Sequence, residues 1–523
     1  MTSPLPQRAE PSGRPPRIVV VGFGPVAARF VDEMLPAATA GAVEVTVVGD
    51  EEHAAYNRVL VADLGVGRTH LGLMGLADAD QLAAENVRVL VGTRAVRLDR
   101  SRRLVHLASG ETIPYDRVVL ATGARAVVPN LTGLNPDPLH PVLPPGVTAL
   151  RDTHDAARLA AAVEARGRIV VLGGGVLGLE AALAASEEGA TVTVVHHGDR
   201  PLGRSIDGLG GATLAAVLRR RGIRVAGNAR STGLETGPDG SFRALLLEDG
   251  SAVDGDLLLL ACGARPRTEL AEGAGLAVGP GVLVDAGLGA LHTEHVFAIG
   301  DCAQPGETAP SGLIGPGWRQ AEWLAARFGH ELLCAPAPAP LAAEGPSVIL
   351  LKARGVNLAT AGDVTADPLD AFALDHAVGE GGPAPLSVSV WSDPEHGAYV
   401  KMATRSGVLA GFVALGMPRA AAELTLLYES GAELPADRSV ILRLDGPEAT
   451  VGAGLPGIAA AAGPESTLCR CAGVSRGTVE QAVAGGCATT EEVSGATRAG
   501  TGCGGCRDDV RELIERHFAA VAA

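Results

Sequence analysis

Four cysteines near the C-terminus have the spacing of a metal or cluster site. Cys469 and Cys471 are separated by one residue, and Cys503 and Cys506 follow later as a C-x-x-C pair. Four thiolates at two corners of a small unit can bind zinc or an iron–sulfur cluster. Glycines next to Cys503 and Cys506 leave backbone N–H groups that can hydrogen-bond cluster sulfides. The spacing predicts one of these two sites.

The segment around these cysteines has the signals of a small helical unit. Ser475 is placed to N-cap a helix, with Val474 and Val479 as a hydrophobic staple. Thr489 and Glu492 have the spacing of a capping box for a second helix. A third helix supplies the core, and the residues expected on its buried face are Val510, Leu513, Ile514 and Phe518.

A glycine-rich turn near the N-terminus connects a β-branched strand to a helix. Gly22 permits the tight turn, and Gly24 lets the backbone approach a pyrophosphate at the helix N-terminus. Asp50 and Glu51 end the next strand, where an acid accepts hydrogen bonds from ribose hydroxyls. This context predicts a dinucleotide site. Its turn residues are Gly22, Gly24, Pro25, Val26 and Ala27.

The same strand, glycine turn and helix occur a second time. The residues expected at this second nucleotide are Gly173, Gly175, Val176, Leu177, Gly178 and Glu180. The strand that follows ends in His196 and His197 in place of an acid, with Arg200 and Arg204 nearby. Without a carboxylate to repel a 2′-phosphate, the site suits NADH or NADPH, with His196 and Arg200 as candidate contacts. A solvated strand end is the alternative interpretation of the two histidines.

Two dinucleotide sites in one chain indicate hydride transfer from a nicotinamide to a flavin. Three further turns follow buried strands, and their candidate cofactor contacts are Ala121, Thr122, Gly123, Gly263, Gly300 and Asp301. In this order the motifs resemble the two-dinucleotide reductases of the pyridine-nucleotide–disulfide oxidoreductase superfamily, over roughly residues 17–330. The resemblance implies that the first turn holds FAD and that Asp301 hydrogen-bonds its ribityl chain.

The disulfide-reducing members carry a redox cysteine pair after the first βαβ unit, but this chain has no cysteine before Cys262. Cys262, Cys302 and Cys334 are single, and we expect them to be buried. The C-terminal cysteines are therefore the predicted electron acceptor, which favours an iron–sulfur cluster over zinc. Their pattern resembles the bacterioferritin-associated-ferredoxin-like (BFD-like) [2Fe–2S] domain.

Three short segments narrow the resemblance, namely 56–60, 300–303 and 351–358. They resemble the FAD-binding part of the large subunit of NAD(P)H-dependent assimilatory nitrite reductase and the electron-transfer subunit of assimilatory nitrate reductase. This resemblance implies that Arg58 contacts the FAD diphosphate and that the Ala95 backbone meets the adenine. Arg151 would lie beside the isoalloxazine.

The resemblance implies a reductase that takes a hydride from NAD(P)H onto FAD and passes single electrons through a [2Fe–2S] cluster to a partner. The expected partner is a molybdenum-containing assimilatory nitrate reductase. The alternatives are a sirohaem nitrite reductase partner, a rubredoxin- or ferredoxin-type carrier, and a non-catalytic redox-responsive binding role. The chain holds no further cysteine-rich region for a sirohaem and [4Fe–4S] site, so we do not expect it to reduce nitrite alone. Hydride transfer itself needs no acid or base, so no catalytic side chain is assigned.

The elements that position these sites predict an α/β chain: two Rossmann-like dinucleotide-binding domains, an α+β C-terminal reductase domain and a small helical [2Fe–2S] domain. Within the α+β domain, Tyr399–Ala403 is expected to pair with Val408–Leu415. The expected divisions are a disordered tail at 1–16, an FAD domain at 17–155 and 286–334, an NAD(P) domain at 156–285, a linker at 335–346, the α+β domain at 347–450, a linker at 451–465 and the BFD-like domain at 466–518.

Composition excludes several classes of protein. The formal net charge of −16 argues against nucleic acid and anionic membranes, and leaves room for a partner with a basic docking patch. No run reaches the roughly 18 apolar residues of a transmembrane helix, and no signal peptide is visible. Cysteines crowded near one end favour metal ligation in a reducing cytoplasm over a disulfide scaffold. The composition does not indicate an oligomeric state.

Overall fold

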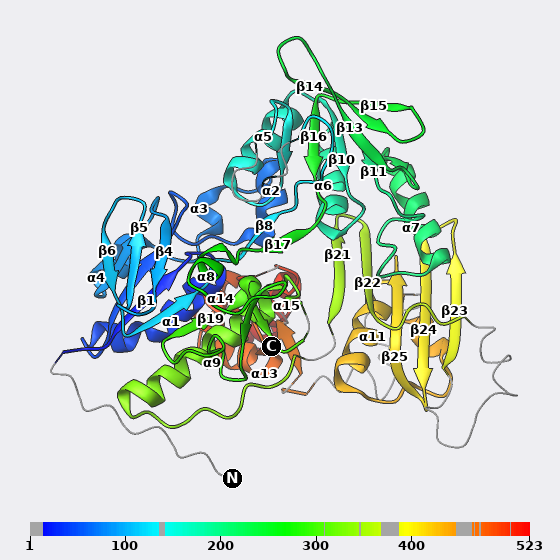
Figure 1. Cartoon of the computed structure of the whole chain (residues 1–523). Helices are drawn as coiled ribbons and strands as arrows, with labels where there is room; N and C mark the ends of the chain where they lie inside the picture. The colour runs from blue at the N-terminus through cyan, green and yellow to red at the C-terminus, as the bar shows by residue number, and fades with distance from the viewer. Residues whose placement is uncertain are drawn as a thin grey trace, which may run out of the picture.

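The computed structural model describes residues 14–134, 137, 142–307, 309–344, 347–367, 386–445, 463–464, 466–469, 472–502 and 504–522. Most of the expected tail at 1–16 therefore lies outside the described residues. Figure 1 shows two α/β units and one α+β unit, with the terminal module beside the first α/β unit. Within the described ranges, no helix has the length and apolar character needed to cross a bilayer.

The first unit contains a five-stranded parallel sheet in the order β19-β7-β1-β2-β3. Its strands are β1 (Arg17–Val21), β2 (Glu44–Val48), β3 (Val87–Leu90), β7 (Arg117–Leu120) and β19 (Val296–Ala298). The central strand β1 is almost wholly buried, as a parallel strand between helical layers must be. Helices α1 (Pro25–Thr39) and α9 (Ile314–Leu333) pack together through Phe30 and Phe328, whose ring centroids are 5.7 Å apart.

Smaller elements surround this sheet and complete its loops. An antiparallel sheet is formed by β4 (Ala95–Asp99), β5 (Leu104–Leu107) and β6 (Thr112–Pro114). The remaining elements are η1 (Arg58–Leu60), α3 (Leu71–Met74), α4 (Ala79–Ala84), α8 (Glu269–Gly273), β18 (Val282–Val284), η2 (Gly300–Cys302) and β20 (Ala303–Pro305). Helix α2 (Val61–Gly65) follows η1 in the sequence but packs into the core of the second unit.

The second unit repeats the architecture in the order β12-β11-β10-β16-β9. Its parallel strands are β9 (Val147–Ala149), β10 (Arg168–Leu172), β11 (Thr191–Val195), β12 (Arg224–Ala226) and β16 (Leu257–Leu260). Its helices are α5 (Thr153–Glu164), α6 (Val176–Glu187) and α7 (Gly208–Arg220). Strand β9 belongs to this sheet although the sequence places it within the expected FAD domain.

Two small sheets complete the second unit. One is antiparallel and contains β13 (Ser231–Thr236), β14 (Phe242–Leu247) and β15 (Ala252–Asp254). In the other, β8 (Ala124–Ala126) pairs with β17 (Ala264–Pro266). Each strand of this second pair leaves the carboxyl end of a different parallel sheet, so together they form a two-stranded connection between the first and second units.

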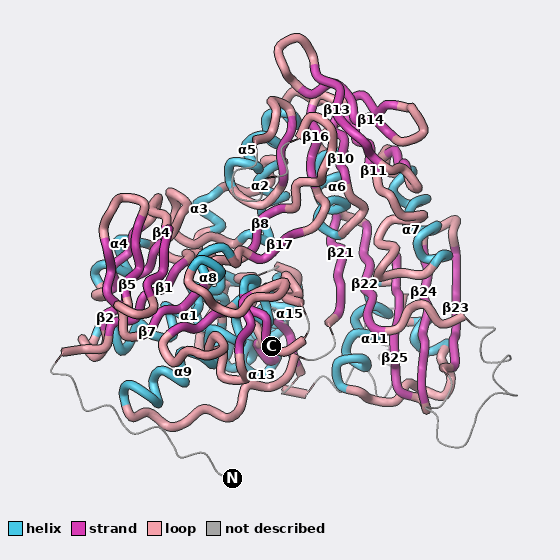
Figure 2. The backbone as a smooth tube through the Cα atoms, viewed as in Figure 1, coloured by secondary structure: helices cyan, strands magenta, loops and turns pink. Residues whose placement is uncertain are grey.

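The third unit is an antiparallel sheet in the order β21-β22-β25-β24-β23 with a helix packed on it (Figure 2). Strands β24 and β25 confirm the predicted hairpin. The elements are β21 (Val348–Ala353), β22 (Val356–Gly362), β23 (Ser387–Asp393), β24 (Ala398–Arg405), β25 (Val408–Leu415), α11 (Pro418–Ser430) and α12 (Ser439–Arg443).

Buried polar side chains connect the third unit to the second. Tyr399 donates a 2.7 Å hydrogen bond to Asp207, which caps α7. Lys401 is only 3% exposed, and its Nζ donates to the Val364 carbonyl at 2.8 Å and lies 3.5 Å from Asp207 Oδ2. The charges of Lys401 and Asp207 therefore compensate each other where the two units meet.

The terminal module contains β26 (Thr467–Cys469), β27 (Val474–Ser475), α13 (Arg476–Ala484), α14 (Thr490–Thr497) and α15 (Arg507–Ala522). Both predicted caps are confirmed: Ser475 accepts from the Thr478 N–H, and Thr489 forms a capping box with Glu492. One expectation is wrong, because Phe518 is 40% exposed. Helix α15 has 16 residues against nine and eight in α13 and α14, so its last turns extend past the helices that cover its start.

Candidate cofactor sites

The first glycine turn combines one close backbone approach with an open helix N-terminus. Gly22 has a φ of +105°, and a Cβ there would lie 2.2 Å from the Ala121 carbonyl oxygen. Gly24 is the N-cap of α1, and the nearest heavy atom to a Cβ there is the Arg58 Nε at 3.8 Å. The helix N-terminus therefore faces a space bordered by a guanidinium, which suits the pyrophosphate of FAD. Pro25, Val26 and Ala27 form the first turn of this helix.

Glu51 is the centre of a charged group beside this turn. It accepts hydrogen bonds from the Arg58 guanidinium and, at 2.7 Å, from the Tyr56 hydroxyl. Burial opposes ionisation of this carboxyl, but the charge and hydrogen bonds of Arg58 and the Tyr56 hydrogen bond hold its pKa below its usual range. Asp50 lies 3.8 Å from Arg267. Two carboxylates thus occupy the strand end where a dinucleotide ribose binds.

Hydrogen bonds hold the segment before Ala95 against the residues that follow β2. The Gly92 N–H donates to the Glu51 carbonyl at 2.7 Å, and the Thr93 N–H donates to the Gly49 carbonyl at 2.8 Å. Ala95 itself begins β4. These bonds bring the expected adenine contact and the expected ribose contact into adjoining loops.

Asp301 and Arg151 form an ion pair at the junction of the two sheets. Arg151 Nη2 donates to Asp301 Oδ2 at 2.7 Å, and its Nε donates to the Ala124 carbonyl at 3.2 Å. Gly300 has a φ of +73°, and its N–H donates to Gln320 Oε1 at 2.8 Å. Thr122 donates from its hydroxyl to the Arg267 carbonyl at 2.8 Å. The turns that carry Thr122 and Asp301 both lie at the carboxyl edge of the first sheet.

Two residues of this site were missed by sequence reasoning. Gln320 is buried in α9 and orients the Gly300 turn through its side-chain amide. Arg267 follows β17 and contacts Asp50 from the second unit. A glutamine in a helix and an arginine after a strand have no motif of their own, so only the tertiary arrangement identifies them. Gly123, which was predicted, has a φ of +67° and accepts from the Arg267 N–H at 2.9 Å.

The second glycine turn has the same construction. A Cβ at Gly173 would lie 2.2 Å from the Ala261 carbonyl oxygen, and one at Gly178 would lie 2.7 Å from the Gly173 carbonyl oxygen. Gly175, the N-cap of α6, has no heavy atom within 4 Å of a Cβ position. This open helix N-terminus suits the pyrophosphate of a second dinucleotide. The other predicted contacts on α6 are Val176, Leu177 and Glu180.

The alternative interpretation, a solvated strand end, is wrong for His196. It is 5% exposed, because Gly174 and Gly227 on either side leave room for the ring to turn inward. Burial lowers its pKa, so the ring is neutral at pH 7, and its Nε2 has no hydrogen-bond partner among the described residues. His197 is exposed.

Arg200 already has partners among its neighbours. Its guanidinium pairs with Asp199, and its Nε donates to the Ile206 carbonyl at 3.1 Å. A third predicted contact, Gly263, follows β16 with a φ of +97° and no heavy atom within 4 Å of a Cβ position. Gly263 therefore leaves open space at the carboxyl edge of the second sheet.

The single cysteines differ in burial. Cys302 is fully buried and donates to the Leu120 carbonyl at 3.2 Å. Cys262 is half-buried, and burial raises its pKa to about 11, so its thiol is a poor nucleophile. The expectation of burial is wrong for Cys334, which is exposed and lies at the C-cap of α9.

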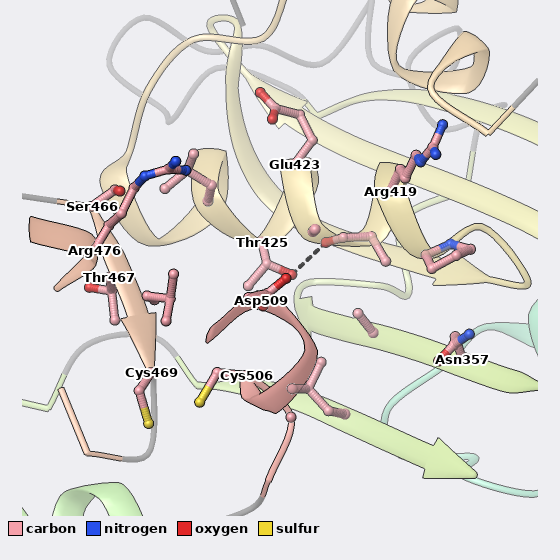
Figure 3. A pocket seen from close by; sticks show the side chains of 18 of the residues that line it. Asn357, Arg419, Glu423, Thr425, Ser466, Thr467, Cys469, Arg476, Cys506 and Asp509 are labelled. Carbon is pink, nitrogen blue, oxygen red and sulfur yellow. Dashed lines mark hydrogen bonds between the residues drawn. The ribbon is translucent and has the colours of Figure 1, made fainter. Parts of the chain in front are cut away.

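Of the four candidate cluster ligands, Cys469 and Cys506 are described, and Cys471 and Cys503 lie outside the described residues. Cys469 ends β26 and Cys506 precedes α15, and both are buried in the module core. Figure 3 shows their sulfur atoms on the same side of the module. Within the described part of the chain, no group of three His, Cys, Asp or Glu residues is arranged to hold a metal.

A cavity of about 590 Å³ adjoins these two cysteines (Figure 3). It lies between the terminal module and the third unit. Its lining includes Leu358, Glu423, Cys469, Arg476 and Cys506. Packing against the third unit therefore does not seal this edge of the module.

Comparison with known proteins agrees with this architecture. The family model described as pyridine nucleotide-disulphide oxidoreductase matches residues 16–319, and the BFD-like [2Fe-2S] binding domain matches residues 467–516. The chain is 28% identical to the nitrite reductase [NAD(P)H] of Bacillus subtilis (strain 168), over 95% of this chain and 57% of that protein. It is 25% identical to the assimilatory nitrate reductase electron transfer subunit of the same organism, over 95% and 59%.

The chain spans about half the length of the curated relatives that it matches. Among solved structures, the covalent putidaredoxin reductase–putidaredoxin complex shares the fold, with a TM-score of 0.66 and 21% identity, covering 83% of this chain and 100% of that chain. The chain belongs to the pyridine nucleotide-disulphide oxidoreductase family, as an FAD-dependent NAD(P)H oxidoreductase with a [2Fe–2S] domain for electron transfer.

Proposed function

We propose that this protein is the reductase component of an assimilatory nitrate reductase, and that it delivers electrons from NAD(P)H to a separate molybdenum-containing protein. The observation that carries the proposal is the pairing of two dinucleotide turns with a [2Fe–2S] domain in a chain that has no cysteine before Cys262. A dithiol acceptor near the flavin is therefore excluded within residues 1–261, and the cysteine module is the acceptor that remains.

The residues of the first unit have distinct roles toward FAD in this proposal. The α1 N-terminus at Gly24 and the Arg58 guanidinium balance the diphosphate charge. Glu51, kept ionised, accepts from a ribose hydroxyl, and Asp301 accepts from the ribityl chain. Arg151 places a positive charge beside Asp301. FAD held by these residues would supply a hydride acceptor for NAD(P)H and a donor of single electrons, which matches the one-electron capacity of a [2Fe–2S] cluster.

The second turn binds the pyridine nucleotide through the α6 N-terminus at Gly175. His196 lines this region as a neutral ring, so it neither attracts nor repels a 2′-phosphate. Arg200 is already paired with Asp199. We therefore propose that the site accepts NADH at least as well as NADPH.

The cluster ligands in this proposal are Cys469, Cys471, Cys503 and Cys506. We retain the division of labour expected from the sequence, with FAD held by 17–155 and 286–334, the pyridine nucleotide by 156–285 and the cluster by 466–518. The cavity beside Cys469 and Cys506 leaves one edge of the module accessible, as electron transfer to an external protein requires.

The acceptor is tested by reconstitution. The protein, loaded with FAD and iron, is mixed with NADH and either a molybdenum nitrate reductase catalytic subunit, a sirohaem nitrite reductase or rubredoxin. The proposal predicts nitrite formation from nitrate with the first partner, at a rate at least tenfold above reduction of either alternative. Equal or faster reduction of rubredoxin, or reduction of nitrite only, contradicts the nitrate assignment. NADH oxidation with an artificial dye separates all of these enzymes from a non-catalytic binding protein.

A further inference from the structure

One side chain of the first unit enters a loop of the terminal module. Asn57 is 3% exposed, and its Nδ2 donates to the carbonyl oxygens of Thr501 at 2.8 Å and Gly502 at 2.5 Å. These two residues immediately precede Cys503, a proposed cluster ligand. A single buried amide therefore uses both of its N–H groups to hold the backbone that leads to this cysteine.

The oxygen of the same amide holds the turn that carries Arg58, the expected contact of the FAD diphosphate. Asn57 Oδ1 accepts from the Val59 N–H at 3.1 Å and so caps η1, which begins at Arg58. Arg58 in turn contacts Glu51 and donates to the Arg151 carbonyl at 3.3 Å. Asn57 is thus bonded both to the loop before Cys503 and to the turn that presents Arg58.

The second contact between the module and the first unit is different in kind. Arg498 Nη1 lies 3.2 Å from Glu33 Oε1 on α1, and both side chains are partly exposed. An exposed ion pair holds its partners weakly and is screened by salt. The Arg498 side chain makes this contact at the C-terminal end of α14, whereas its backbone carbonyl accepts from the Thr501 hydroxyl at 2.8 Å. The buried amide has a fixed geometry, so Asn57 is the contact that can set the position of the loop before Cys503.

We propose that Asn57 is a positioning residue for electron transfer between the flavin and the cluster. This inference rests on the proposed function and adds the internal route to it. Each transfer moves one electron from the flavin side to the cluster, and no bond is made or broken at Asn57. The residue acts by fixing two loops against each other, because electron transfer slows steeply when donor and acceptor separate and a supporting contact must hold a site to a fraction of an ångström.

The test uses the full chain loaded with FAD and iron. Asn57→Asp keeps the side-chain shape and the Oδ1 cap, but places an oxygen against the two carbonyls, which must then separate. Asn57→Ala removes the amide altogether and is the second variant. Asn86→Asp, at an exposed position of the same unit, is the control for the added charge. FAD and iron contents are measured for every variant.

Two readouts are compared. Hydrogen exchange at the amides of 498–502 is expected to accelerate about tenfold in both Asn57 variants and to stay unchanged in Asn86→Asp. In rapid mixing with NADH, flavin bleaching in Asn57→Asp, which keeps the Oδ1 cap of η1, is expected to stay within twofold of the wild type. The electron paramagnetic resonance signal of the reduced cluster is expected to develop at least tenfold more slowly. A purely structural role would loosen the loop without separating these two rates.

Unchanged exchange at 498–502, or a cluster that is reduced as fast in both variants as in the wild type, would overturn the proposal. The same comparison is made with light-driven reduction of the flavin in place of NADH. If NAD(P)H does not reduce the wild-type flavin but the cluster is reduced after photoreduction, the proposed function is contradicted. The cluster reduction rates of the Asn57 variants after photoreduction then still test the role of Asn57. A wild-type cluster that is reduced under neither condition contradicts both.

Discussion

The guanidinium of Arg151 lies 2.7 Å from the carboxylate of Asp301, although the two residues follow strands of different sheets. Arg151 comes after β9 of the second sheet, and Asp301 lies in η2 after β19 of the first. Because active sites of open α/β sheets form at the carboxyl ends of strands, this ion pair marks the point where the two dinucleotide-binding units meet. The flavin and the nicotinamide are expected to meet there too.

Replacing Asp301 tests its proposed role toward FAD. Asp301→Ala removes the acceptor for the ribityl chain and leaves the Arg151 guanidinium without its partner. We expect the variant to retain less than about one tenth of the wild-type flavin after gel filtration, a loss of roughly 1.4 kcal/mol or more in binding. The ratio of flavin to protein absorbance gives the result. Asp239→Ala, in an exposed turn with Ser241, is the control, and full flavin retention by Asp301→Ala would contradict the assignment.

Two glycines of the second turn separate folding from nucleotide binding. Gly175→Ala meets no heavy atom within 4 Å, so the variant should fold with normal flavin content but bind NAD(P)H poorly, with KM raised at least tenfold. Gly173→Ala places a methyl group 2.2 Å from the Ala261 carbonyl oxygen and should destabilise the unit itself. Steady-state kinetics and thermal denaturation of the two variants distinguish these effects. A normal KM for Gly175→Ala would contradict pyrophosphate binding at this turn.

Asp199 is predicted to restrain the use of NADPH. Its carboxylate pairs with Arg200, so Asp199→Asn should free the guanidinium for a 2′-phosphate and remove a repelling charge. The ratio of kcat/KM for NADPH to that for NADH is expected to rise about fivefold, or roughly 1 kcal/mol. Asp249→Asn, in an exposed turn of the same unit, removes the same charge and should leave the ratio unchanged. An unchanged ratio in Asp199→Asn would exclude Arg200 as a phosphate contact.

The joint between the second and third units should depend on one buried charge pair. Asp207→Asn leaves Lys401, which is 3% exposed, without a counter-charge, and is expected to cost about 3 kcal/mol of unfolding free energy. Lys401→Met removes the buried ammonium and should cost clearly less, because Asp207 keeps its hydrogen bond from Tyr399. Urea denaturation followed by circular dichroism compares them. Equal losses of unfolding free energy in the two variants would show that the unpaired charge of Lys401 does not cause the destabilisation of Asp207→Asn.

Features that depend on local geometry could be predicted from the sequence. The turns at Gly22 and Gly173 require positive φ and a close backbone approach, conditions that only glycine meets, so the residues identify the turn. The capping box of Thr489 and Glu492 is likewise complete within four consecutive residues. The βαβ units and the module helices follow from such signals.

Features that depend on residues distant in the sequence could not be predicted in this way. His196 is buried because Gly174 and Gly227 leave space beside it, and Cys334 is exposed because a helix ends there. Asn57 lies in segment 56–60, which carries part of the family resemblance, yet its hydrogen bond to the Thr501 carbonyl crosses 444 positions of sequence. No spacing rule connects residues so far apart, and only the packing of the terminal module on the first unit brings them together.

Anaerobic titration with NADH shows whether electrons leave the flavin through the C-terminal cysteine module. Flavin absorbance and the electron paramagnetic resonance signal of the reduced cluster are recorded together in the wild type and in Cys506→Ser. We expect NADH to reduce both centres in the wild type. In Cys506→Ser the flavin should still bleach, while no cluster signal and no electron delivery to an acceptor protein appear. A wild-type protein that contains zinc in place of iron, or a Cys506→Ser variant that delivers electrons at the wild-type rate, would contradict this route of electron exit.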